Sequence, residues 1–226
     1  MNPASSSLSR RELLFGRGLS QAATSVAPAR FLGPGTHEAT GFTNADRASR
    51  RMPDCLVRSH RDETLRFVSD LLSDQRVLLG FIYTRCDGIC PTTTRNMAAT
   101  YRILKERNSA PFRIISLSVD PVRDNADDLA RYAARDGLAD IPEWHCVVAG
   151  VPETLASRPA LRLVDPDPKR DGDLNNHSGL LVMGNDRTNR WGGMPSGAEP
   201  SQIAGTFDRI ARSVSLQEYA GFGRAS

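Results

Sequence analysis

Strand-like and helix-like segments alternate along the chain from about residue 52 to residue 214. The segment RVLLGFIYT, 76–84, is rich in β-branched and aromatic residues and predicts a central strand that is buried on both faces. Further strands are predicted at 112–120, 144–150, 178–184 and 190–195, and helices at 91–107, 125–137, 151–162 and 199–214. This alternation predicts a layered α/β domain.

Two cysteines lie where the first central strand is predicted to end. Cys86 falls in the strand-to-helix loop and Cys90 at the start of the next helix, which is the edge where α/β sheets place their sites. Unpaired N–H groups at a helix start favour a thiolate and lower its pKa. Gly88 helps the loop turn, so that both sulfur atoms point to one place. Two such thiolates can form a disulfide or hold a soft metal ion, whereas two buried, inert cysteines are the alternative.

The composition excludes several classes of function. A hydrophobic content of 39% and a charged content of 24% are typical of a globular protein, and no apolar run approaches the roughly 20 residues of a transmembrane segment. The net charge of +3 arises at the N-terminus, where residues 1–51 hold seven arginines against three acidic residues. The chain has no basic stripe interleaved with aromatic residues, so we expect no nucleic-acid binding. Four cysteines in 226 residues do not make a disulfide scaffold.

The N-terminus has the order of an export signal. Ser9-Arg10-Arg11 resembles the twin-arginine motif, and an uncharged stretch then ends in small residues. We therefore predict a twin-arginine-type signal segment at 1–29 and a soluble periplasmic protein, with a disordered tail as the alternative. The remaining predicted parts are a linker at 30–51, the folded domain at 52–214 and a C-terminal tail at 215–226.

Three separated motifs resemble the SCO/SenC family. They are YTRCDGICPTTT at 83–94, SLSVDPVRDNADDLARYA at 116–133 and NNHSGLLVMG at 175–184. The resemblance implies a thioredoxin-like three-layer sandwich, with a central mixed β-sheet flanked by helices. It also implies copper handling tied to cytochrome c oxidase assembly, with Cys86, Cys90 and His177 as the copper ligands.

The chemistry of these three residues agrees with the resemblance. Two thiolates and one imidazole make the soft, low-coordinate donor set that copper(I) prefers, whereas copper(II) needs a further ligand. Zinc fits the same residues, with water as a fourth ligand. Asp120 is expected to bond the backbone of the next turn, and a supporting role beside the metal is the alternative.

The other cysteines and histidines are assigned no site. Cys146 is predicted to be inert core, with His145 facing the opposite side of its strand. Cys55 is predicted to be a free thiol at the start of an edge strand at 54–60, and the two remaining histidines fall in linker and turn contexts.

Two functions from different classes follow. The first is an exported copper metallochaperone, expected to be a monomer, that delivers copper to cytochrome c oxidase or another periplasmic acceptor. The second is a thiol–disulfide oxidoreductase that reduces the cysteines of such an acceptor through Cys86 and Cys90. The spacing favours the first, because dedicated oxidoreductases usually have two residues between their cysteines. The two functions also differ at His177, which the chaperone requires and the reductase does not.

Overall fold

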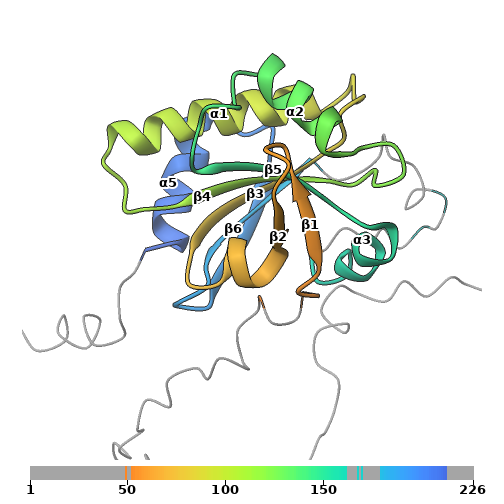
Figure 1. Ribbon diagram of the computed structural model, residues 1–226. Helices are drawn as coiled ribbons and strands as arrows, with labels where there is room; N and C mark the ends of the chain where they lie inside the picture. Colours follow the sequence, from red (N-terminus) through yellow and green to blue (C-terminus); the bar gives the residue numbers. More distant parts are fainter. Residues whose placement is uncertain (1–48, 50–51, 162–166, 168, 170–178, 213–226) are drawn as a thin grey trace, which may run out of the picture. The chain divides into compact units, whose positions relative to one another are not determined.

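A seven-stranded mixed sheet forms the centre of the computed structural model, which describes residues 49, 52–161, 167, 169 and 179–212 (Figure 1). The order across the sheet is β2-β1-β5-β4-β3-β6-β7. β3, β4 and β5 are parallel to one another, and every other neighbouring pair is antiparallel. The strands are β1 (Leu56–Ser59), β2 (Thr64–Arg66), β3 (Arg76–Ile82), β4 (Arg113–Ser118), β5 (Trp144–Ala149), β6 (Leu180–Asn185) and β7 (Arg190–Pro195).

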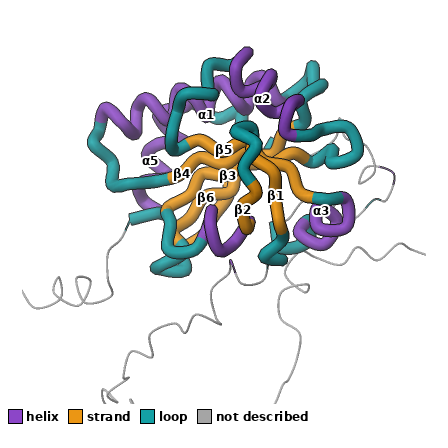
Figure 2. Tube along the Cα trace, in the orientation of Figure 1, coloured by secondary structure: helices purple, strands orange, loops and turns teal. Residues whose placement is uncertain are grey.

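Helices cover both faces of the sheet. They are α1 (Cys90–Glu106), α2 (Ala126–Arg135), α3 (Val151–Ser157), α5 (Pro200–Ile210) and a π-helical segment, η3 (Phe67–Leu72). Figure 2 shows α1 and α2 lying together along one side of the sheet, and α5 packs beside α1 on that side. The predicted α/β sandwich with a central mixed sheet is confirmed.

The side chains of β3 alternate between two apolar clusters, one on each face. Leu78 belongs to the cluster under α1, α2 and α5, and Leu79 belongs to the cluster that contains Phe67 of η3. All seven residues of β3 are buried, as predicted for the central strand. Gly80 lets α1 approach this strand closely, because an added Cβ would lie only 2.4 Å from the sulfur of Met97. The middle of α1 therefore packs directly on β3.

The predicted edge strand at 54–60 is wrong in its position. The strand begins at Leu56, after Cys55, and β2 pairs along its outer side, so β2 and β7 are the two edge strands of the sheet. β2 was missed because it has only three residues, and η3 because a π-helical turn lacks the 3.6-residue period of an α-helix. Asp62, with a φ of 62°, makes the turn that joins β1 to β2.

The helices in the described ranges are all too short or too polar to cross a membrane. The predicted signal segment at 1–29 and the tail at 215–226 lie outside the described residues. The predicted domain boundaries therefore stay predictions.

Candidate functional site

The two cysteines meet at the carboxyl end of β3. The strand ends at Ile82, and after a short loop α1 begins at Cys90. The Cys86 N–H donates to the carbonyl oxygen of Tyr83 at 3.1 Å, which turns the loop back on itself. Both cysteines are free thiols, and the Cys90 thiol donates a hydrogen bond to the Cys86 sulfur. The predicted placement of Cys86 in the loop and Cys90 at the helix start is confirmed.

Several donors converge on the sulfur of half-buried Cys86. They are the thiol and the N–H of Cys90, the hydroxyl of Tyr83 and the N–H of Gly88. Burial pushes the pKa of Cys86 up, but these hydrogen bonds outweigh burial and hold it below the ordinary value of a thiol. The loop passes close to this sulfur, since an added Cβ at Gly88 would lie 3.9 Å from it. Cys86 is therefore the thiol that ionises more readily.

Cys90 behaves in the opposite way. It is only 1% exposed, and burial, followed by its contact with Cys86, raises its pKa to about 12. The argument from the helix start, which predicted a lowered pKa, is wrong for this residue. The sulfur of Cys90 also accepts hydrogen bonds from the N–H groups of Tyr83 and of Cys90 itself, but burial in the core outweighs them.

A buried carboxylate ties the thiol loop to the loop between β4 and α2. Asp124, 5% exposed, accepts hydrogen bonds from the N–H and the hydroxyl of Thr84, at 3.1 and 2.6 Å. It also accepts from the hydroxyl of Ser118 at 2.6 Å. Thr84 lies two residues before Cys86, so this carboxylate fixes the path of the chain into the site.

Asp120 has a turn-forming role in the same loop. Its carbonyl oxygen accepts from the N–H groups of Arg123 and Asp124, at 3.2 and 2.9 Å. Its carboxylate pairs with the Arg123 guanidinium at 3.3 Å. The bond to the next turn is thus made by the main chain of Asp120.

The amino end of β6 lies against the start of α1. An added Cβ at Gly179 would be 3.0 Å from the Ile89 side chain and 3.0 Å from the Ser196 hydroxyl oxygen. The Ser196 N–H donates to the carbonyl of Gly179 at 2.6 Å, and the Thr93 hydroxyl donates to the Ser196 hydroxyl at 2.7 Å. Because Ile89 precedes Cys90, the chain enters β6 directly beside the thiol loop.

The third predicted ligand, His177, lies outside the described residues. Within the described ranges, no three histidine, cysteine or acidic side chains are grouped so that they could hold a metal ion. Those ranges thus bring together two of the three predicted ligands, Cys86 and Cys90.

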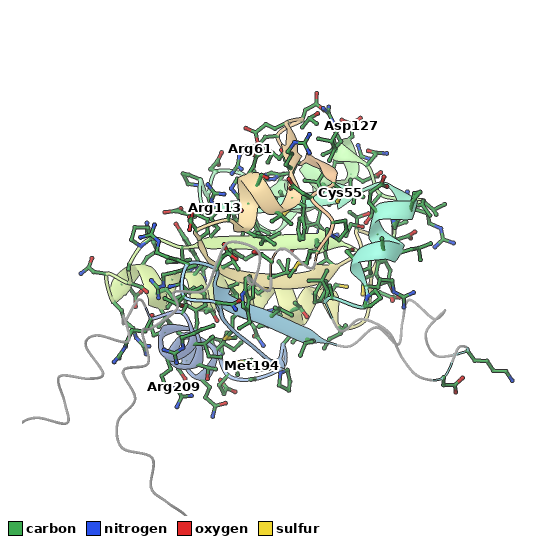
Figure 3. All side chains as sticks on the ribbon, turned by 90° about the horizontal axis from the view of Figure 1, so that it is seen from below. Cys55, Arg61, Arg113, Asp127, Met194 and Arg209 are labelled. Atoms are coloured by element: carbon green, nitrogen blue, oxygen red, sulfur yellow. The ribbon has the colours of Figure 1, made fainter. Side chains whose placement is uncertain are left out.

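The remaining cysteines lie apart from this pair. Cys146 is fully buried in β5, and its N–H donates to Nδ1 of His60 at 3.2 Å. Cys55 is half-buried in the apolar cluster of the opposite face (Figure 3), and burial is the main cause that raises its pKa. Among the described residues, neither cysteine belongs to a group of side chains that could hold a metal ion.

Sequence reasoning missed the contacts that Tyr83 and Asp124 make with the thiol loop. A tyrosine that ends an apolar run gives no sign that its hydroxyl meets a sulfur. An aspartate just before a helix suggests only a turn or a cap, and here Asn125 makes the cap of α2. Both contacts depend on how the loops fold over the sheet edge.

A pair of free thiols at the first turn of a helix, directly after the central strand of a mixed sheet, defines a thioredoxin-like protein with a Cys-x-x-x-Cys site. The family model SCO1/SenC matches residues 62–211. The chain belongs to the SCO1/SenC family, as its motifs predicted.

Known relatives agree with this assignment. The SCO1 protein homolog of Bacillus subtilis is 44% identical over 62 residues, which are 27% of this chain and 32% of that protein, so the match spans about a third of that relative. The copper-bound structure of Bradyrhizobium japonicum ScoI is 22% identical, with a TM-score of 0.54, and the match covers 70% of this chain and 98% of ScoI. BsSco is a member of the Sco family of cytochrome c oxidase assembly proteins, in which a disulfide switch was identified. Its structure is 19% identical over 73% of this chain and 95% of its own, with a TM-score of 0.58. At these identities the two structures support the fold.

Proposed function

We propose that this protein binds copper through Cys86, Cys90 and His177 and passes it to cytochrome c oxidase or another periplasmic acceptor. The observation that carries the proposal is the meeting of two free thiols at the start of α1, beside the point where the chain enters β6. Thiolates and an imidazole are donors for soft copper(I), and the structure of the relative ScoI contains copper.

Chain connectivity supports His177 as the third ligand. Gly179 packs against Ile89, the neighbour of Cys90, and two residues of extended chain span at most about 7 Å. The contact of Gly179 with the residue before Cys90 therefore supports the proposal that His177, two positions before Gly179, is a ligand together with the two cysteines. An imidazole would complete a three-coordinate site.

Copper binding is tested by loading the metal-free protein under anaerobic conditions. One equivalent of copper(I) should bind, and copper(II) should produce thiolate-to-metal charge-transfer absorption. The double variant Cys86→Ser/Cys90→Ser should lose both signals, with the buried Cys146→Ser as the matched control. Copper binding by the double variant as tight as that of the parent would place the site elsewhere. Zinc that displaces bound copper would instead assign zinc as the metal.

The delivery role and the periplasmic location rest on the family and on the N-terminal motif. BsSco is a cytochrome c oxidase assembly protein, and Arg10-Arg11 has the twin-arginine pattern. Replacing both arginines by lysine should leave the protein in the cytoplasm, as measured by cell fractionation. Undiminished periplasmic recovery of that variant would refute twin-arginine export.

The asymmetry of the two thiols favours thiol–disulfide exchange as a second candidate function. Cys86 is half-exposed and readily ionised, whereas Cys90 is buried with a raised pKa, which suits an attacking and a resolving thiol. The variant His177→Ala separates the two functions. Loss of copper(II) affinity by a larger factor than copper(I) affinity, with an unchanged reduction potential, supports the chaperone. An unchanged copper(II) affinity with a shifted potential supports the oxidoreductase.

A further inference from the structure

Helix α3 has its polar and apolar sides reversed. A surface helix normally buries its apolar side, whereas α3 buries Thr154 and Ser157. The hydroxyls of these two residues donate to the carbonyl oxygens of Gly150 and Thr154, both at 2.9 Å, so they are satisfied within the helix. The exposed residues of α3 and of the turn after it are all apolar, and together they form the α3 face: Val151, Pro152, Leu155, Ala156, Pro159 and Ala160. A contiguous exposed apolar surface indicates contact with another molecule.

The α3 face lies at the same edge of the sheet as the thiols. α3 follows the carboxyl end of β5, which is parallel to β4 and β3 (Figure 1). β5 lies two strands from β3, which is about 10 Å. A partner that approaches the sulfur atoms of the site therefore comes to the edge where the α3 face is exposed.

The other exposed apolar side chains lie at this edge too. Leu56 and Val122 are the two further large apolar residues that the described part of the chain exposes. Leu56 begins β1 beside the end of β5, and Val122 belongs to the loop after β4. A surface hollow is lined both by Gly150, directly before α3, and by Asp124, which holds Thr84 of the thiol loop. The apolar surface is thus continuous with the surroundings of the thiols.

The size and charge of the α3 face favour a transient protein partner. A helix of seven residues is only about 10 Å long. A stable dimer buries about 1,200 Å² or more, which a face of this length does not provide, whereas short-lived redox complexes bury less. The two charged residues of the segment, Glu153 and Arg158, are half-buried and of opposite sign. The α3 face therefore lacks the basic residues with which surface helices bind anionic lipid.

We propose that the α3 face docks the acceptor protein, and that the acceptor contributes an apolar surface beside its own copper or disulfide site. This docking rests on the proposed function, in which cytochrome c oxidase is the acceptor, and adds where and how the two proteins meet. An apolar contact is little affected by ions, whereas an attraction between exposed charges is screened by them. The affinity for the acceptor should therefore depend weakly on salt.

The test measures binding of the metal-free protein to copper-depleted cytochrome c oxidase by surface plasmon resonance. Leu155→Asp and Leu155→Lys should each weaken binding at least about tenfold, because either charge would have to be desolvated in an apolar contact. Ala110→Asp and Ala110→Lys are the matched controls, since Ala110 is exposed in the loop before β4, at the opposite edge of the sheet. Both controls should bind like the parent. The affinity of the parent should change by less than about twofold between about 0.05 and 0.5 M salt.

A second position keeps the test independent of folding defects. Val151 is the first residue of α3, where an acidic side chain is favoured by the unpaired N–H groups of the helix start. Val151→Asp should therefore fold like the parent, with an unchanged midpoint of urea unfolding, and should also weaken binding to the oxidase.

Several results would overturn the proposal. They are an oxidase that does not bind the parent, Leu155 variants that bind as tightly as the parent, weaker binding with only one sign of charge, and a steep fall of affinity with salt. A parent dimer that Leu155→Asp makes monomeric would assign the α3 face to a second copy of the chain. Binding of the parent, but not of Leu155→Asp, to phospholipid vesicles would assign it to a membrane. Either assignment would also overturn the proposal.

Transfer of copper(I) from the loaded protein to the oxidase separates this proposal from the proposed function. Weaker docking of the Leu155 variants, with a parent that transfers no copper, supports the docking face and refutes copper delivery. Transfer by the parent, with equal rates and affinities in the Leu155 variants, supports copper delivery and refutes the docking face.

Discussion

The carboxylate of Asp124 should determine whether the thiol loop holds its shape. It accepts three hydrogen bonds, from the N–H and hydroxyl of Thr84 and from the hydroxyl of Ser118. In Asp124→Ala, the half-buried N–H of Thr84 loses its acceptor, which costs about 1–3 kcal/mol. The two hydroxyls lose about 1 kcal/mol each, since they can rotate toward other groups. We expect the variant to lose about 3–5 kcal/mol of unfolding free energy.

The variant Asp124→Asn tests the geometry more finely. An amide oxygen in the place of Oδ2 still accepts from the Thr84 N–H and the Ser118 hydroxyl, and the amide nitrogen can donate to the Thr84 hydroxyl. Only the extra strength of bonds to a charged acceptor is lost, so we expect a cost of about 1–2 kcal/mol.

Urea unfolding of the metal-free proteins measures both variants. With a slope of about 1–3 kcal/mol per molar urea, Asp124→Ala should shift the midpoint by about 1 M or more, and Asp124→Asn by less than half of that. The exposed Asp127→Ala is the matched control, because Asp127 lies on the outer side of α2. A loss below about 1 kcal/mol in Asp124→Ala would refute the view that this carboxylate braces the loop. An equal loss in both variants would show that charge, not geometry, is what the loop requires.

Three further outcomes are expected. At neutral pH iodoacetamide should modify Cys86 at least about tenfold faster than Cys90, because Cys86 has the lowered pKa and is half-exposed; mass spectrometry that finds the reverse order would contradict this. Gly179→Val should lower the unfolding free energy by about 1–3 kcal/mol, whereas Gly197→Val should not, because an added Cβ meets nothing within 4 Å there. Burial and two nearby arginines lower the pKa of His145 to about 4, so its contribution to stability is present above pH 6.5 and is lost as the pH falls from about 6.5 toward 4. The unfolding free energy, measured by urea unfolding at several pH values, should fall by at most about 1 kcal/mol per pH unit in this range. In His145→Gln this dependence on pH should be weaker.

The parts of the fold that local patterns determine were predictable. A seven-residue apolar run gave the central strand, since only a strand buried on both faces tolerates such a run. The C-terminal end of α2 was also predictable from the sequence. Gly137, just after the helix, adopts a φ of 69°, a conformation that a residue without a Cβ adopts easily. The positions of Cys86 and Cys90 followed from the strand and the helix on either side of them.

The parts that depend on tertiary contacts were not predictable. The bond between Thr84 and Asp124 joins residues 40 positions apart, and no local pattern marks either residue as a partner of the other. The pKa of Cys90 depends on how deeply α1 sinks into the core, which the helix-start argument does not include. β2 was missed because three residues are too few to show a period, and η3 because a π-helical turn does not have the period of an α-helix.

The antiparallel placement of β6 beside β3 bears on the proposed site, whose three residues are far apart in the sequence. The register pairs Gly80 of β3 with Leu181 of β6, and continuing it by two residues sets Gly179 opposite Ile82, the last residue before the thiol loop. The amino end of β6 and the carboxyl end of β3 therefore meet at one edge, as antiparallel neighbours must. Had β6 been parallel to β3, the residues before it would lie at the opposite edge. The order of the three sequence motifs thus has a topological cause. The thiol loop follows β3, and the chain comes back to the same edge of the sheet where β6 begins.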